Sequence, residues 1–343
     1  MNNQYIFTFL KKLGFFALPF VGFFIIYLLV DPFKVIRDYP SFYKSGYPSY
    51  IALNRDYVST TTFDKYYLTN NYNSFILGNS RSIFYEVKDW KPHLNSSQSC
   101  FHFDASGENL YGIYKKVKYL NNKVPNIDNA LLILDYDTLS GTEPHNEGHL
   151  FIISPQLENG KNFFQFHLEF LKAFSNPRFL FAFIDFNLFG KVKNYMKTAN
   201  LFDDRPFFYE LISNEIRFQY FESMIDKDEN LYYGPRNHIF YERTGKIKYS
   251  PPCIRDKQKV YLEKIKNIFH KHKTNYKIII SPLYDQIGLN RDDVKSLCRI
   301  FGTENVYDFS GINEFTNNYR NYYETSHYRP HVTCKIIKEI YKE

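Results

Sequence analysis

Cysteine is scarce in this chain of 343 residues, and its arrangement excludes the common structural zinc sites. The four cysteines are Cys100, Cys253, Cys298 and Cys334, and no two of them form a CxxC pair. An even number permits two disulfides outside the cytoplasm, whereas buried free thiols are the alternative. The cysteine pattern therefore predicts no metal site and leaves the disulfide state open.

The sequence also lacks the signatures of nucleic-acid-binding proteins. It contains no zinc-finger spacing, no RNA-binding signature and no basic stripe. The net charge is +7, but the 43 Lys and Arg residues are interleaved with 36 Asp and Glu residues. A positive net charge favours binding of anionic glycans, lipid head groups or nucleic acid, whereas interleaved charges are typical of an ordinary solvated surface. We therefore expect no nucleic-acid partner.

Internal repeats and low-complexity tracts are absent as well. Hydrophobic residues make up 44% of the chain, aromatic residues 20% and charged residues 23%. This composition supplies a packed core and excludes disorder over the whole length. A mean hydropathy of −0.43 excludes a polytopic membrane protein. The length allows one large domain or two small ones.

Long apolar runs are limited to the amino terminus, where residues 14–30 read GFFALPFVGFFIIYLLV. This uncharged run approaches the roughly 20 residues that cross a bilayer. Lys11 and Lys12 precede it and favour a cytoplasmic amino terminus. A cleaved signal peptide would have a shorter run and a cleavage site of small residues, but this run ends in YLLVDPFK. We therefore predict an uncleaved single-pass anchor over residues 1–33.

The remainder of the chain alternates short apolar runs with amphipathic stretches. The expected strands are Ser74–Leu77, Cys100–Phe103, Ala130–Leu134, Tyr276–Ile280 and Asn305–Phe309. Helical spacing of apolar residues follows the second of these runs, precedes and follows the fourth, and recurs at the carboxyl terminus. Short apolar runs suit strands that are buried on both faces of a parallel sheet. The alternation predicts a doubly wound α/β domain.

We expect this domain to occupy residues 74–343, after an approach segment over residues 34–73. Residues from about 140 to 250 interrupt the alternation, and we interpret them as a mostly helical insertion. The insertion contains FLFAFIDFNLF at residues 179–189, which is short for a membrane span and includes Asp185. A buried helix and an interfacial helix lying on the membrane are the two interpretations of this run.

A serine directly follows the first expected strand, in the sequence GNSRS at residues 78–82. Ligands of α/β sheets bind beyond the carboxyl ends of the strands. A tight turn that begins with Gly78 would expose the hydroxyl of Ser80 and point backbone N–H groups outward. Taken alone, this segment is explained better by an ordinary strand-to-helix turn with a Ser or Asn cap.

A carboxylate and a histidine lie three residues apart before the last expected helix. These residues are Glu324 and His327, within YETSHY. At this spacing the carboxylate can bond the imidazole, fix its tautomer and raise its basicity, which a nucleophilic serine requires. The pairing of this motif with Ser80, at opposite ends of one predicted sheet, points to a catalytic site. His145 and His149 are explained by a solvated loop and His270 and His272 by a helix end, whereas His331, one helical turn beyond His327, is a candidate substrate contact.

These motifs resemble those of the SGNH hydrolases, also called GDSL esterases. The resemblance is closest to the membrane-anchored branch that includes alginate O-acetylation proteins and the D-alanyl-transfer protein of teichoic-acid systems. It covers residue 74 to the carboxyl end, apart from the insertion. The family's Gly-Asp-Ser block is matched by GNS, so Ser80 takes the nucleophile's place. Gly107 matches the glycine of the second block, and Glu324 and His327 match the Asp-x-x-His block.

The resemblance implies a three-layer α/β/α domain and identifies oxyanion-binding groups. Two departures accompany it: the acid is Glu324 in place of aspartate, and the third block, normally Gly-x-Asn-Asp, is replaced by DYD at residues 135–137. The usual oxyanion asparagine is therefore missing. We expect the N–H groups of Arg81 and Gly107 to hold the oxyanion, with Asn109 as a substitute for the missing side chain.

The resemblance implies a serine-dependent acyltransferase or carboxylic ester hydrolase acting on a cell-surface polysaccharide. It implies no cofactor, an extracytoplasmic (periplasmic) location of the domain on the cytoplasmic membrane, and a polytopic membrane-bound O-acyltransferase as partner. The alternative is a catalytically degenerate domain that binds glycan or partner within an acylation complex. The missing asparagine favours this alternative, and the pairing of Ser80 with His327 favours the enzyme.

Overall fold

A five-stranded parallel sheet forms the centre of the computed structural model, which describes residues 3–95, 97–200 and 202–342. The strands lie in the order β11, β9, β4, β2, β3, and every neighbouring pair is parallel. In that order they span Val306–Asp308, Asn275–Ile280, Asn129–Leu134, Ser74–Leu77 and Cys100–His102. All five expected strands are confirmed, with bounds that differ by at most one residue at either end.

The strand order places a switch point between β2 and β4. From β2 the chain crosses to the edge strand β3, and it then returns past β2 to form β4 on the other side. Connections that leave two neighbouring strands in opposite directions open a crevice at the strands' carboxyl ends. Leu77 pairs with Leu132 in this register. The residues that follow β2 and β4 therefore meet at the position where doubly wound sheets bind ligands.

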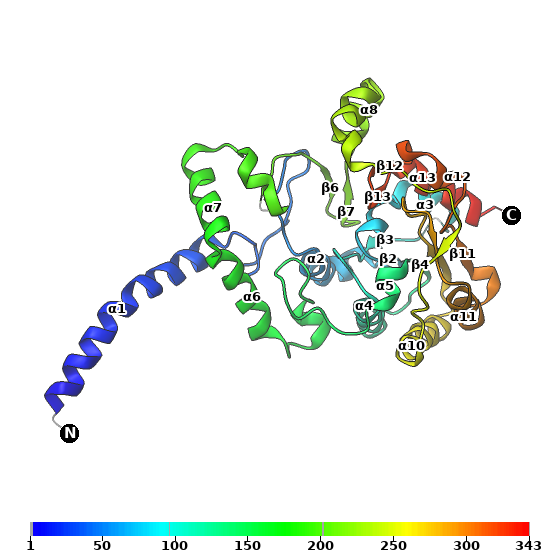
Figure 1. Ribbon diagram of the computed structural model, residues 1–343. Helices are drawn as coiled ribbons and strands as arrows, with labels where there is room; N and C mark the ends of the chain where they lie inside the picture. The colour runs from blue at the N-terminus through cyan, green and yellow to red at the C-terminus, as the bar shows by residue number, and fades with distance from the viewer. Residues whose placement is uncertain (1–2, 96, 201, 343) are drawn as a thin grey trace.

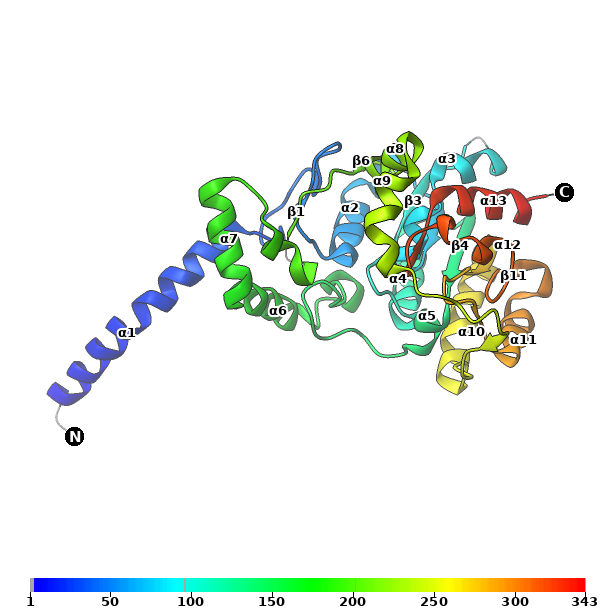
Figure 2. The same cartoon turned by 45° about the horizontal axis from the view of Figure 1, so that its top comes forward.

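Long helices follow or precede the strands, as the alternation predicts (Figures 1 and 2). The helices outside the insertion are α1 (Asn3–Val30), α2 (Arg55–Asn70), α3 (Val87–Trp90), α4 (Leu110–Lys123), α5 (Tyr136–Ser140), α10 (Asp256–His272), α11 (Arg291–Phe301), α12 (Glu314–Asn317) and α13 (Pro330–Ile340). The short 3₁₀ helix η1 (Ser80–Phe84) follows β2 directly.

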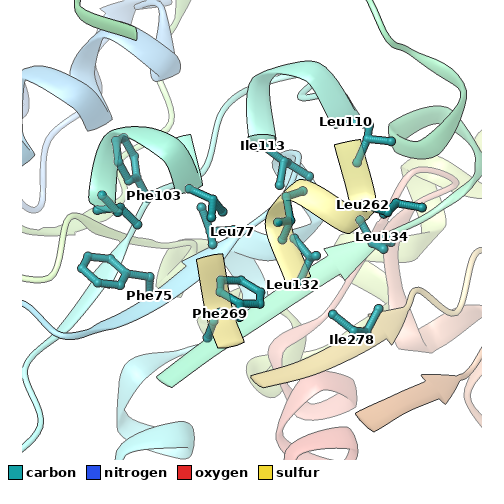
Figure 3. Packing of buried hydrophobic residues seen from close by; sticks show 14 of the residues in the cluster. Phe75, Leu77, Phe103, Leu110, Ile113, Leu132, Leu134, Leu262, Phe269 and Ile278 are labelled. Atoms are coloured by element: carbon teal, nitrogen blue, oxygen red, sulfur yellow. The ribbon is translucent and has the colours of Figure 1, made fainter. Parts of the chain in front are cut away.

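The larger core cluster lies on one face of the sheet. Alternate strand residues such as Phe75, Leu132 and Ile278 point into it, together with side chains of α4 and α10 such as Ile113 and Leu262 (Figure 3). Successive side chains of a strand point to opposite faces. The other alternate residues therefore enter a second buried cluster, which includes side chains of α3 and α13. Burial on both faces explains the continuous apolar runs of the strands.

Helix α2 lies in the approach segment, where the sequence pattern predicted no helix. Asn54 caps its first turn by accepting a hydrogen bond from the N–H of Tyr57. Much of its buried face is polar and includes Arg55, which forms an ion pair with Asp104. Phe63 nevertheless enters the larger core cluster. An apolar period was absent from the sequence because buried ion pairs and hydroxyl groups occupy most of the positions that face the sheet.

The insertion combines helices with short strand pairings, two of them antiparallel and one parallel. Its helices are α6 (Phe163–Ser175), α7 (Pro177–Phe189), α8 (Gln219–Lys227) and α9 (Glu229–Tyr233). Strand β6 (Phe208–Glu210) pairs with β7 (Glu215–Arg217), β5 (Phe202–Asp203) pairs with β1 (Tyr50–Ile51), and β8 (Lys248–Tyr249) pairs with β10 (Ile287–Gly288). The predicted helices are present, but the expectation of a mostly helical segment missed these pairings, because two- and three-residue strands leave no alternation to detect.

Helix α1 begins before the predicted apolar run and ends with it. Its segment from Tyr5 to Val30 is long and apolar enough to cross a membrane, and little of it is buried within the protein. The four cysteines are free thiols, of which Cys100 and Cys253 are buried. The interpretation as buried free thiols therefore holds for two of the four residues, and the other two are partly exposed.

We expect the packing of α2 to be measurable through Phe63. This side chain is fully buried, and its ring stacks on that of Phe103 at a centroid distance of 5.4 Å. The substitution Phe63→Ala should lower the free energy of unfolding by about 3–5 kcal/mol. Leu68→Ala on the same helix is the control, because Leu68 is 75% exposed and should change stability by less than about 0.5 kcal/mol. Denaturant unfolding of the purified variants measures both changes. Equal losses of unfolding free energy in the two variants would contradict this packing.

Candidate active site

The turn that carries Ser80 begins where β2 ends, and it requires glycine at its first position. A Cβ atom added to Gly78 would lie 2.8 Å from the carbonyl oxygen of Ile133 on β4 and 3.0 Å from Cβ of Ser82. Two backbones can approach this closely only where a side chain is absent. The glycine therefore allows the turn to lie against β4 and places Ser80 at the switch point of the sheet.

Asn79 fixes the next part of this turn. Its Oδ1 atom accepts a hydrogen bond from the N–H of Arg81 at 3.0 Å, as expected for a residue that caps η1. Its Nδ2 atom donates to Asp135 at 2.8 Å and to Thr138 at 2.9 Å, and both of these residues follow β4. The amide thus ties the turn after β2 to the turn after β4, while Ser80 stays partly exposed.

Ser80, His327 and Glu324 form a continuous hydrogen-bonded chain. The imidazole Nε2 atom lies 2.8 Å from the Ser80 hydroxyl oxygen, and Nδ1 is bonded to the Glu324 carboxylate. When Nδ1 carries the proton that the carboxylate accepts, Nε2 is free to accept the proton of the hydroxyl. The two motifs that were paired from the sequence therefore lie within hydrogen-bond reach of each other.

The acid and the histidine are brought together by a β hairpin. Strand β12 (Tyr322–Glu324) pairs with β13 (His327–Tyr328), and Glu324 is the cross-strand partner of His327. The hairpin loop also turns the N–H of Ser326 toward the carboxylate at 2.7 Å. The glutamate therefore reaches the imidazole across a strand pair, and its additional methylene does not prevent the contact.

The charge state of Glu324 suits this contact. Partial burial favours the neutral acid, but the hydrogen bonds from His327 and from Ser326 outweigh burial and hold the pKa of Glu324 below its ordinary value. The carboxyl group is therefore ionised at neutral pH. An ionised carboxylate stabilises the positive charge that the imidazole acquires when it accepts a proton.

Arg81 connects the serine turn with the hairpin. Its guanidinium lies 2.5 Å from Asp135 and 3.6 Å from Asp137, and its Nε atom donates to the carbonyl oxygen of Ser326 at 3.2 Å. Burial opposes the charge of Arg81, but these carboxylates outweigh burial and raise the pKa of the guanidinium. One side chain thus holds the turn after β2, the turn after β4 and the hairpin loop at fixed separations.

The expected oxyanion groups are only partly in place. The N–H of Arg81 donates to Asn79, so it is engaged within the turn. Asn109 caps α4 through the N–H of Gly112, and its Nδ2 atom donates to the carbonyl of Glu143. Among the residues that the structure describes, Asn109 makes no hydrogen bond to Ser80. The geometry therefore offers no support for Asn109 as a substitute oxyanion donor.

Gly107 lies in the loop after β3, as the second-block match requires. Its backbone has a left-handed φ of +60°, and its carbonyl oxygen lies 3.0 Å from Nε2 of His145. The contribution of its N–H to an oxyanion site stays a prediction.

Side chains of the insertion also hold the hairpin in place, and no local sequence pattern predicts these contacts. Arg329, next to β13, forms two hydrogen bonds of 2.9 and 2.8 Å with Glu222 of α8. The same carboxylate accepts from the hydroxyl of Tyr323 at 2.6 Å. In addition, Tyr232 of α9 donates to the carbonyl of Tyr323 at 3.1 Å. Helices α8 and α9 therefore fix the strand that presents Glu324.

A pocket of about 270 Å³ opens beside the Ser80 turn, beyond the carboxyl ends of β4 and β9. Its lining includes Arg81, Asp137, Asp285, Tyr249 and Thr325. Burial raises the pKa of Asp285 above its ordinary value. The sequence analysis did not select the pocket's acidic residues. Their positions could have identified them, because each follows a strand of the sheet at its carboxyl end, where ligands of α/β domains bind.

No family model and no curated protein matches this chain. Within the described part of the chain, no group of three or more His, Cys, Asp or Glu side chains is arranged to hold a metal ion. The chemical interpretation of the site therefore rests on its own geometry. A serine hydroxyl bonded to an imidazole that is itself oriented by a carboxylate is suited to nucleophilic attack on an ester or acyl carbonyl.

We expect Ser80 to react covalently with a fluorophosphonate probe, which labels activated serines. Ser80→Ala should abolish labelling, and His327→Gln should slow it by about 10³-fold or more because the general base is lost. Ser82→Ala is the matched control, since the buried Ser82 hydroxyl donates to the Asn79 carbonyl at 2.7 Å and faces away from the site. Equal labelling of the Ser80→Ala variant and the wild-type protein would show that Ser80 is not the nucleophile.

Proposed function

We propose that this chain is a membrane-anchored SGNH-type enzyme that transfers or hydrolyses an O-linked acyl group, such as acetyl, on a cell-surface polysaccharide. The observation that carries the proposal is the hydrogen-bonded chain from Ser80 through His327 to Glu324. Its position at the switch point of a parallel sheet, with Ser80 after the first strand and His327 before the last helix, supports the SGNH assignment and a three-layer α/β/α domain.

The proposed reaction proceeds through an acyl-serine. The Ser80 oxygen attacks the acyl carbonyl while Nε2 of His327 takes the hydroxyl proton, and Glu324 stabilises the resulting imidazolium. Collapse of the tetrahedral intermediate breaks the bond to the leaving alcohol, which receives the proton from His327. A glycan hydroxyl or water then attacks the acyl-serine, and His327 takes and returns that proton in the same way. The reaction requires no cofactor.

The oxyanion would be held by backbone N–H groups of the Ser80 turn and of Gly107. The N–H of Arg81 would have to leave the Asn79 side chain to take part, because it donates to Oδ1 in this structure. Removal of one oxyanion donor costs about 3 kcal/mol in characterised hydrolases. Release of this donor from Asn79 is therefore a cost that the proposed reaction has to meet.

The pocket beside Ser80 supports a hydroxyl-rich acceptor. Sugar hydroxyls donate hydrogen bonds, and the carboxylates of Asp137 and Asp285 accept them. The aromatic ring of Tyr249 offers an apolar face to a sugar ring. The acidic lining disfavours a polyanionic glycan, because like charges repel at close range. We therefore assign a neutral or amino-substituted glycan to this pocket.

The amino-terminal helix supports a single-pass anchor in the cytoplasmic membrane, with the domain on the extracytoplasmic (periplasmic) side. Lys11 and Lys12 lie before the apolar run and favour this orientation. An activated acyl group on this side of the membrane has to be supplied across the bilayer. A polytopic membrane-bound O-acyltransferase is the partner that the proposal requires.

A second candidate function is a degenerate SGNH domain that binds glycan or partner without catalysis. The specific observation in its favour is that the Arg81 N–H and the Asn109 amide both have other partners. The pocket beside Ser80 would then be the binding site. The two candidates differ in whether the serine hydroxyl is needed.

Acyl content of the surface glycan should depend on Ser80 in cells. In a deletion strain, Ser80→Ala should reduce acylation by several orders of magnitude, as loss of a triad serine does. Glu324→Ala should cost about 10²- to 10⁴-fold, since His327 would lose its orientation but not its chemistry. Ser82→Ala, at an equal protein level, is the control. Acylation equal to that of wild-type cells with Ser80→Ala would refute the enzyme and favour the binding module, whereas acylation above that level would indicate hydrolysis in place of transfer.

The anchor should keep the chain in the membrane fraction. Alkaline carbonate removes peripheral proteins but leaves proteins with a spanning helix in the pellet, because about 20 apolar residues in the bilayer cannot be displaced by pH. We expect the chain to pellet at full length after this extraction. A shortened, soluble product would indicate cleavage after residue 30 instead.

A further inference from the structure

Helix α7 presents a second apolar face that the fold does not bury. Phe181, Ile184 and Leu188 are 65%, 50% and 72% exposed. Their spacing of three and four residues places them on one side of the helix. The opposite side, which includes Phe179 and Ala182, is buried in the cluster that α6 and α7 share with the end of α1. Helices of soluble domains normally expose a polar face here, so this face requires an apolar environment.

The charges of this segment are arranged in a way that fits a lipid surface. The carboxylate of Asp185, which lies within the helix, is bonded to Lys193 at 2.7 Å and to the hydroxyl of Tyr195. Arg178 at the start of the helix and Lys191 just after its end are both exposed. An apolar face with a neutralised acid and cations at both ends is characteristic of helices that lie in the interface of an anionic bilayer.

The location of α7 identifies which apolar environment covers it. Phe174 of α6 packs on Phe23 and Tyr27 of α1, with ring centroids 5.1 and 5.2 Å apart. The same ring contacts Phe183 of α7 at 5.8 Å. Figures 1 and 2 show α7 beside the carboxyl-terminal end of α1, away from the central sheet. Helix α7 therefore lies next to the end of the apolar amino-terminal helix.

The contacts with α1 also set the depth at which helices α6 and α7 lie. The 18 residues from Leu13 to Val30 extend about 27 Å, close to the ~30 Å thickness of the hydrocarbon core. Phe23 lies seven residues before Val30, about 10 Å along the helix axis. Side chains that pack on Phe23 and Tyr27 are thus held at the depth of the head groups and upper acyl chains, where interfacial helices lie about 5–10 Å deep.

We propose that α7 is a membrane-seating helix that inserts Phe181, Ile184 and Leu188 into the lipid leaflet next to the end of α1. The partner is the bilayer itself, not a second protein chain. Two attachments, one spanning and one interfacial, fix the height and tilt of the domain above the membrane, whereas α1 alone would allow it to pivot. The inference depends on α1 spanning the bilayer and does not depend on the chemistry at Ser80.

Quenching by brominated lipids tests this proposal on the full chain in nanodiscs of phosphatidylcholine and phosphatidylglycerol. Leu188→Trp reports on α7, Leu29→Trp on the exposed side of α1, and Leu68→Trp on a distant exposed position of α2. Trp90, the chain's own tryptophan, is buried and contributes a constant background. Acyl-chain bromine should reduce the added emission of Leu188→Trp to a similar extent as that of Leu29→Trp, and should leave Leu68→Trp unchanged.

The proposal is overturned if Leu188→Trp escapes bromine quenching. Accessibility to aqueous iodide equal to that of Leu68→Trp would show that the face stays in water. Protection from iodide without bromine quenching would show that a second copy of the chain covers it. Absence of quenching at Leu29→Trp would remove α1 from the membrane and the proposal with it. Fluorophosphonate labelling of the same samples reports on Ser80 separately, so failure of the proposed function is distinguishable from failure of the seating helix.

Discussion

The parallel pairing of β2 with β4 is the constraint on which the candidate site depends. It places the turns after both strands at one edge of the sheet, with the backbones so close that position 78 must be glycine. Asn79 and Arg81 then bond across to Asp135. Without this register Ser80 would still follow a strand, but no fixed surface would exist for the histidine to approach.

The histidine reaches that surface from far along the chain. His327 and Ser80 are 247 positions apart, and the hydrogen bond between them joins the two ends of the α/β domain. The hairpin that presents His327 is held on one side by Arg81 through the Ser326 carbonyl. It is held on the other side by Glu222 of the insertion. The insertion is therefore part of the support of the site, although it supplies none of the three residues of the hydrogen-bonded chain.

The helices of the insertion pack in two different core clusters. Helices α8 and α9 pack in the core cluster on one face of the sheet, together with α13. Helices α6 and α7 form their own aromatic cluster with the end of α1. Both clusters are rich in Phe and Tyr, whose rings supply large buried areas. The same division separates the candidate site from the proposed membrane contact.

The sequence by itself determined the five strands, the apolar amino-terminal helix and the two motifs around Ser80 and His327. These features are local: apolar runs, a glycine before a serine, and an acid three residues before a histidine. The same local reasoning missed α2, because buried polar groups such as Arg55 give no apolar period. Only the tertiary structure decided that the Asn109 amide donates to the carbonyl of Glu143 and that Glu222 supports the hairpin. Such partners are chosen by distances between segments remote in sequence, and no local pattern records them.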